Sequence, residues 1–261
     1  TSVPGPSRYR RLLRETIHSL DGAAPIEDAR EILLDAILDE DDVSRLFLSN
    51  ENFICVPQRI FENGAFYPQA EAKLAAFAQL FKNDSLEIFL ALRDPATFIT
   101  ELYQPTDPQS HASLLGGADP LAVRWADLAL RIKSTLPLAN LTVWCNEDTP
   151  LLWPDILRAV AGLAPDTPID GLYQIVEEIM SKEGFARFER YLKENPPESS
   201  AHLKRVMSVF LEKFGLEEEI EVELATDKTG WTHAYAAMLS QAYDADVARI
   251  GDIPGVRLMI P

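Results

Sequence analysis

The sequence predicts an α/β fold, in which a parallel sheet is flanked by helices, with a mainly helical carboxyl-terminal half. Two observations predict it. Short apolar runs alternate with amphipathic segments up to about residue 150, and strands that alternate with helices form right-handed parallel sheets. Beyond that point only helical periodicity continues. We therefore expect an α/β core at residues 1–160 and a helical region, packed on that core, at residues 161–261.

Three short apolar runs are the candidate strands of the core. They are VSRLFLS at 43–49, LEIFLAL at 86–92 and NLTVWCN at 140–146. Amphipathic segments separate them, and prolines near several of their starts suit the first turn of a helix. These segments predict helices at 7–20, 24–42, 67–84, 95–103 and 120–137.

The carboxyl-terminal half is divided by proline-rich joins at 165–168 and 195–197. The charge block EEEIEVE at 217–223 is most simply a solvated helix end. The final IPGVRLMIP can return to the core as a short extended segment. Between these features the periodicity predicts helices at 154–163, 171–195, 201–216 and 232–250.

Composition excludes several classes of function. The 261 residues are 47% apolar and 25% charged, which is ordinary for a globular protein. A net charge of −17 repels nucleic acid and anionic membrane surfaces. No apolar run is long enough to cross a bilayer as a helix. We expect neither nucleic acid nor a membrane as a partner.

The cysteines and histidines indicate a reduced compartment and no metal. Cys55 and Cys145 lie far apart without a CxxC pattern, and the four histidines are scattered. No charged-then-apolar signal segment precedes the first predicted helix. We therefore expect a cytoplasmic protein without a metal cofactor.

One basic cluster stands out against the acidic background, in the sequence SRYRRLLR. Helical spacing places Arg10 and Arg14 on one face, with Arg11 beside them. Two interpretations stay open: a solvated helix start, or a local site for phosphate or sulfate.

All three predicted strands end in polar residues, and the carboxyl ends of parallel strands share one edge of a sheet, where ligands bind. Arg93, after the second strand, offers donors suited to phosphate, and Pro95 can start a helix whose free N–H groups favour anions. The alternative is a helix cap with a surface arginine.

Glu51, after the first strand, is a candidate general base, and the alternative is that it is a turn residue. Glu147 and Asp148, after the third, favour a structural role.

The order of these motifs resembles the sulfotransferase superfamily. Strand–SNENF, helix, strand–ALRDPATFITELY, long helix and strand–VWCNED are similar to the "SdEN", "RdP…S.Y" and "W.yED" motifs of its bacterial branch, over residues 43–160. The resemblance implies a P-loop-like α/β fold that transfers a sulfuryl group from PAPS to a hydroxyl or amine. It implies that Arg93 binds the 3′-phosphate and that Glu51 is the base. The arginine cluster, with Arg10, then borders the cofactor.

Two departures from the family pattern define the alternatives. Glu101 stands where the family carries a serine, and a carboxylate there repels a phosphate. The sequence also has no glycine-rich loop with Lys-Thr or Lys-Ser. We therefore expect either that the sequence lacks about one strand–loop–helix unit or that no working loop exists. The function is then a PAPS-dependent sulfotransferase, a non-catalytic relative that binds an anionic ligand or a protein partner, or an assembly role that includes homo-oligomers.

Overall fold

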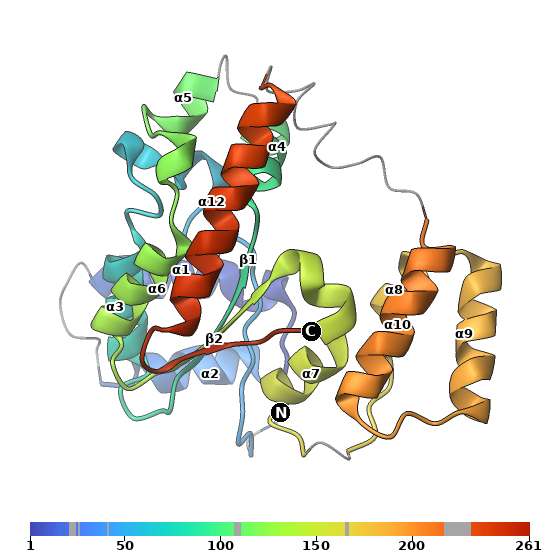
Figure 1. Ribbon diagram of the computed structural model, residues 1–261. Coiled ribbons are helices and arrows are strands. Elements are labelled where there is room, and N and C mark those ends of the chain that lie inside the picture. The colour runs from blue at the N-terminus through green and yellow to red at the C-terminus, as the bar shows by residue number, and fades with distance from the viewer. Residues whose placement is uncertain (21–24, 26, 41, 107–110, 165–166, 217–230) are drawn as a thin grey trace.

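The computed structural model describes residues 1–261 except 21–24, 26, 41, 107–110, 165–166 and 217–230, and it is a mixed α/β structure (Figure 1). In the described part of the chain, a parallel sheet has three strands in the order β1 (Glu87–Leu92), β2 (Asn140–Cys145) and β3 (Val256–Leu258). β1 and β2 pair in register from Glu87 opposite Asn140 to Leu92 opposite Cys145. The predicted strands at 86–92 and 140–146 and the extended carboxyl-terminal segment are confirmed.

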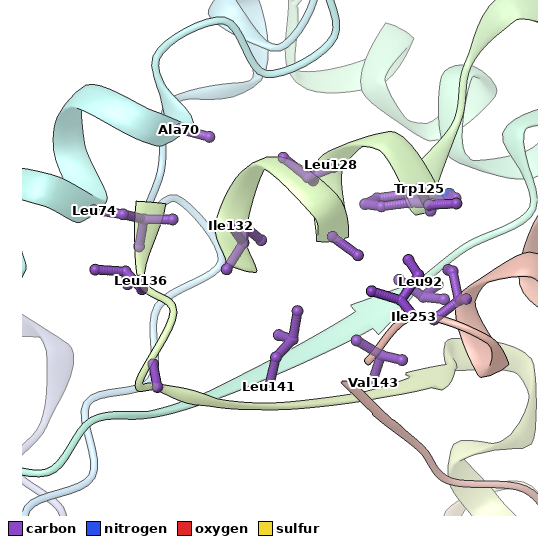
Figure 2. Close-up of a cluster of buried hydrophobic side chains, with 14 of the residues drawn as sticks. Ala70, Leu74, Leu92, Trp125, Leu128, Ile132, Leu136, Leu141, Val143 and Ile253 are labelled. Carbon is purple, nitrogen blue, oxygen red and sulfur yellow. The ribbon is translucent and has the colours of Figure 1, made fainter. Parts of the chain in front are cut away.

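One face of the sheet is covered by α3 (Ala70–Leu80), α6 (Trp125–Thr135) and α12 (His233–Gly251). Leu141 and Val143 of β2 point to this face and share a cluster with Leu128 and Ile132 of α6 (Figure 2). All four side chains are almost fully buried. Each contributes roughly 1.5–3 kcal/mol of transfer free energy, so this cluster is the main source of stability for the sheet.

A second cluster joins α1 (Pro6–Leu20) and α2 (Ala29–Ile37) to the end of α3. Tyr9 and Leu33, one from each of the first two helices, are only 1% exposed and pack with Leu80. The predicted amino-terminal helices therefore form the rim of the helical layer.

The opposite face of the sheet is covered by α7 (Thr149–Ala161). Successive side chains in a strand point to opposite faces, so Trp144 turns away from the cluster that holds Val143. It packs instead with Leu152 and Ile156 of α7. The sheet is thus enclosed between α7 and the helical layer of α3, α6 and α12.

Three helices form a separate group beside α7, on the side away from α3 (Figure 1). They are α8 (Gln174–Glu178), α9 (Lys182–Glu194) and α10 (Ser200–Phe214). We call this group the α8–α10 cluster. Its own apolar core surrounds Phe188 and Met207, and Leu151 of α7 packs against it. The remaining helices are short or connect the strands: α4 (Pro95–Thr106), α5 (His111–Leu115) and the 3₁₀ turns Pro57–Arg59, Glu62–Gly64, Pro120–Ala122 and Asn146–Asp148.

The prediction of a paired strand at 43–49 is wrong. The segment is extended, but its ladder in the described residues is a single parallel bridge between Leu46 and Ser2. An apolar alternating run needs a neighbouring strand to complete a ladder, and this segment exchanges no backbone hydrogen bond with β1. The predicted helix end at 217–223 lies outside the described residues. None of the described helices is long and apolar enough to span a membrane.

Candidate functional site

The polar ends of β1 and β2 meet at the carboxyl edge of the sheet. Because Leu92 pairs with Cys145, the residues that follow each strand leave the sheet side by side. The backbone N–H of Asp94 donates a hydrogen bond of 2.9 Å to Oε1 of Glu147. Two of the three predicted strand ends therefore share one site.

Asp94 joins three elements at this edge. Its Oδ1 accepts the N–H of Ala96 at 2.8 Å, which caps the first turn of α4. Its Oδ2 accepts a hydrogen bond from the Ser240 hydroxyl of α12. The side chain is therefore used to connect β1, α4 and α12, which is the helix-cap interpretation of the Arg93-Asp94-Pro95 sequence.

Arg93 forms a bidentate ion pair with Glu101. Its side chain is 18% exposed, and its guanidinium contacts both carboxylate oxygens of Glu101, with 2.6 Å between Nη2 and Oε1. Its Nε also donates to the Thr97 hydroxyl at 3.3 Å, and its carbonyl accepts the Trp125 indole N–H at 2.8 Å. The paired guanidinium donors that suit a phosphate thus bind a carboxylate of the same chain, in the geometry that a bidentate anion would use.

Glu147 is held by two donors from different elements. Besides the N–H of Asp94, the Tyr243 hydroxyl of α12 lies 3.3 Å from its Oε2. Burial raises the pKa of Tyr243 well above its ordinary value, so the phenol stays protonated and donates. This arrangement supports the structural interpretation of Glu147.

A cavity of about 550 Å³ lies between the sheet edge and the α8–α10 cluster. Arg93, Asn146 and Glu147 line it from the sheet, and Ser208 and Glu212 of α10 line it from the opposite side. With Arg93 already paired to Glu101, the lining carboxylates Glu147 and Glu212 leave the cavity with an acidic balance.

Glu51 does not join this site. Glu51 is exposed, and its Oε1 accepts a hydrogen bond of 3.1 Å from the side-chain amide of Asn52. In the same turn, Oδ1 of Asn50 accepts a hydrogen bond of 3.0 Å from the backbone N–H of Asn52. Glu51 is not among the residues that line the cavity. The turn interpretation therefore accounts for its observed contacts.

Arg10 lies on α1, away from Arg93 in sequence and outside the cavity lining. The Tyr9 hydroxyl donates to the carbonyl of Ser49, which places the start of α1 beside the SNENF turn. Arg10 is exposed there. Neighbouring arginines of the cluster form ion pairs, Arg8 with Asp39 and Arg11 with Glu15. The structure thus brings the arginine cluster to the first polar strand end and not to the other two.

Residues on α12 were missed by the sequence reasoning. Ser240 and Tyr243 contact Asp94 and Glu147, and Asp246, three residues further on, is buried against the start of α6. Their spacing of three residues places them on one helical face. That period was visible in the sequence, but their partners depend on the packing of α12 across the sheet.

No metal-binding arrangement is present in the described residues, since none of their His, Cys, Asp and Glu side chains gather in groups of three or more. Both cysteines are free, and burial raises the pKa of Cys55 to about 11. That thiol is protonated at neutral pH and is a poor nucleophile.

In comparisons with known proteins, no family model, no curated protein and no solved structure matches this chain.

Proposed function

We propose that this chain is a non-catalytic relative of the sulfotransferases that acts by binding a protein partner. The proposed sulfotransferase-like fold is supported by parallel strands whose RDP and NED sequences meet at one carboxyl edge. The observation that carries the non-catalytic assignment is the bidentate contact between Arg93 and Glu101. The arginine that the family resemblance assigns to the 3′-phosphate is already satisfied by a carboxylate.

Electrostatics favour this assignment over an anion-binding one. A phosphate that approaches Arg93 must displace Glu101 and remain close to it, and like charges at that distance repel. Glu147 and Glu212 line the adjoining cavity and add to the repulsion. An acidic chain with a net charge of −17 attracts partners with basic surfaces instead.

A PAPS-dependent sulfotransferase is the second candidate. The α4 helix begins at Pro95, two residues after Arg93, and Arg93 itself lines a cavity large enough for a ligand. In this alternative PAPS or PAP replaces Glu101 on Arg93, Arg10 borders the cofactor and Glu51 is the base.

Calorimetric titration with PAP separates the two candidates. We expect no measurable heat with the unmodified protein. Glu101→Ser frees the guanidinium and restores the family residue, so it should give measurable heat with PAP, with an affinity at least tenfold above the detection limit, a gain of about 1.4 kcal/mol. Glu71→Ser is the matched control. Glu71 also pairs with an arginine, with 3.0 Å between its Oε2 and Nη1 of Arg131, and neither residue lines the cavity.

The contrary result is tight PAP binding by the unmodified protein that Arg93→Ala abolishes. It would establish a working nucleotide site and favour the enzyme. Sulfuryl transfer from PAPS that is lost in Glu51→Gln would then assign the base.

A further inference from the structure

The cavity at the carboxyl edge of the sheet combines apolar walls with carboxylates. Its volume of about 550 Å³ is that of an ordinary ligand pocket. Glu147 lines it from the sheet, and Glu212 lines it from α10. The apolar lining residues are Pro150 and Leu151 in the first turn of α7, Ile179 after α8, Leu211 in α10 and Leu216 after α10. A ligand that fits this cavity therefore needs an aliphatic body and a group that carboxylates attract.

The charged side chains that line the cavity give it a net negative charge. They are Arg93, Glu147 and Glu212. The ion pair with Glu101 neutralises Arg93, and Glu101 itself is outside the lining. The first turn of α7 also lies at the cavity, but the carboxylate of Asp148, directly before this helix, offsets the positive end of its dipole. The cavity therefore attracts a cation and repels an anion.

The two carboxylates differ in their contacts. Glu147 is held by the N–H of Asp94 at 2.9 Å and by the Tyr243 hydroxyl at 3.3 Å, and each of its oxygens keeps a lone pair for a further donor. Glu212 is exposed, and its carboxylate contacts no hydrogen-bond donor or cation among the described residues. Ser208, one turn earlier on the same face of α10, adds a hydroxyl acceptor. The cavity thus offers a cation one fixed carboxylate and one that is available to it.

We propose that this cavity binds one lysine or arginine side chain of the protein partner, with the charged group attracted by Glu147 and Glu212 and the aliphatic stem against the apolar walls. Lysine and arginine join a charged head to an apolar stem, which is the combination that the lining requires. This inference rests on the proposed function, because it takes the cation from the partner proposed there. It also gives Glu101 a role: by neutralising Arg93, Glu101 makes the cavity selective for cations.

Binding is tested by fluorescence anisotropy with the peptide Ala-Leu-Lys-Leu-Ala, blocked at both ends and carrying a neutral fluorophore. A matched peptide has norleucine in place of lysine, which keeps the aliphatic stem and removes the charge. We expect the lysine peptide to bind saturably and at least tenfold more tightly than the norleucine peptide. Equal binding of the two peptides, or no saturable binding of the lysine peptide, would overturn the proposal.

A pair of charge-matched variants separates the cavity from the acidic surface as a whole. Glu212→Gln removes a lining carboxylate, so it should bind the lysine peptide at least fivefold more weakly. Glu189→Gln removes the same charge from an exposed position on α9 outside the lining, and its affinity should stay within twofold of the unmodified protein. Equal losses in the two variants would show a general attraction to an acidic chain and would refute a site in the cavity.

The role of Glu101 is tested with Glu101→Ser, the variant that is expected to bind PAP. Without Glu101 the guanidinium of Arg93 adds an uncompensated positive charge to the lining. The variant should therefore bind the lysine peptide at least fivefold more weakly than the unmodified protein does. Unchanged affinity for the lysine peptide would contradict the selectivity assigned to Glu101.

The cation site and the proposed function fail in different ways. Tight PAP binding by the unmodified protein overturns the non-catalytic assignment, whichever peptide binds. Equal binding of the lysine and norleucine peptides, without PAP binding, overturns the cation site alone. Free pentylamine has a similar stem and charge without a peptide backbone, and we expect it to displace the labelled peptide only at concentrations at least tenfold above the peptide's dissociation constant. Displacement by pentylamine at that constant would assign the cavity to a free amine and overturn its assignment to a partner's side chain.

Discussion

Replacing Asp246 with alanine is expected to lower the free energy of unfolding by about 2–3 kcal/mol. Asp246 of α12 is 1% exposed, and its Oδ2 accepts the N–H of Ala126 at 3.1 Å, in the first turn of α6. Alanine leaves that buried N–H without an acceptor, in a helix that supplies much of the main core. Urea unfolding followed by circular dichroism measures the loss, as a lower midpoint with an unchanged denaturant slope.

Two further variants show whether the hydrogen bond or the charge matters. Asp246→Asn keeps an oxygen acceptor of nearly the same shape, so it should cost less than about 1 kcal/mol. Asp244→Ala, on the exposed side of the same helix, should change stability by no more than about 0.5 kcal/mol. If Asp246→Asn were as destabilised as Asp246→Ala, the capping explanation would be wrong.

The difference in stability between the wild type and Asp246→Asn should depend on pH with a defined sign. Burial raises the pKa of Asp246 above its ordinary value, so the folded protein binds this proton more readily than the unfolded chain. Stability attributable to this group therefore falls as pH rises from the unfolded pKa through the folded one. Asparagine does not titrate, so the wild type should gain stability relative to Asp246→Asn as the pH is lowered from neutral to about 4. A constant difference between the two proteins across that range would contradict this.

The sequence predicted those features that depend on local pattern. β1 and β2 were visible as short apolar runs, and the meeting of Arg93-Asp94 with Glu147 followed from the rule that parallel strands end at one edge. The sequence indicates that Glu101 is incompatible with a phosphate, but its bidentate contact with Arg93 depends on the course of α4, which the sequence does not give.

Features that depend on tertiary neighbours were not predictable. The run at 43–49 has the alternation of a strand, yet its ladder in the described residues is a single bridge to Ser2. Alternation alone does not show whether a neighbouring strand lies close enough to exchange backbone hydrogen bonds. Asp246 reads as an ordinary polar residue of an amphipathic helix, because its partner, the N–H of Ala126, lies 120 residues away. Glu51 belongs to the same class: its position after an apolar run indicated the sheet edge, while the observed turn keeps it out of the cavity lining.

Phe188→Ala is expected to unfold the α8–α10 cluster before the sheet. Phe188 is fully buried at the centre of that cluster, and its ring lies 5.3 Å from Tyr173 and 5.4 Å from Phe210. Truncation of a buried phenylalanine to alanine typically costs about 3–5 kcal/mol. The buried core of this cluster shares no residue with the core around Leu141, so the loss should appear first as local opening.

Hydrogen exchange by mass spectrometry distinguishes local from global loss. Amides of α9 and α10 should lose protection in Phe188→Ala while those of β2 retain it. Glu189→Ala, at the exposed neighbouring position on α9, should alter neither region appreciably. Parallel loss of protection in β2 and α9 would instead show one cooperative unit. The distinction bears on the cavity, because Ser208 and Glu212 form its wall on α10: if the cluster opens alone, access to the carboxyl edge of the sheet is governed by the stability of three helices and not by that of the whole fold.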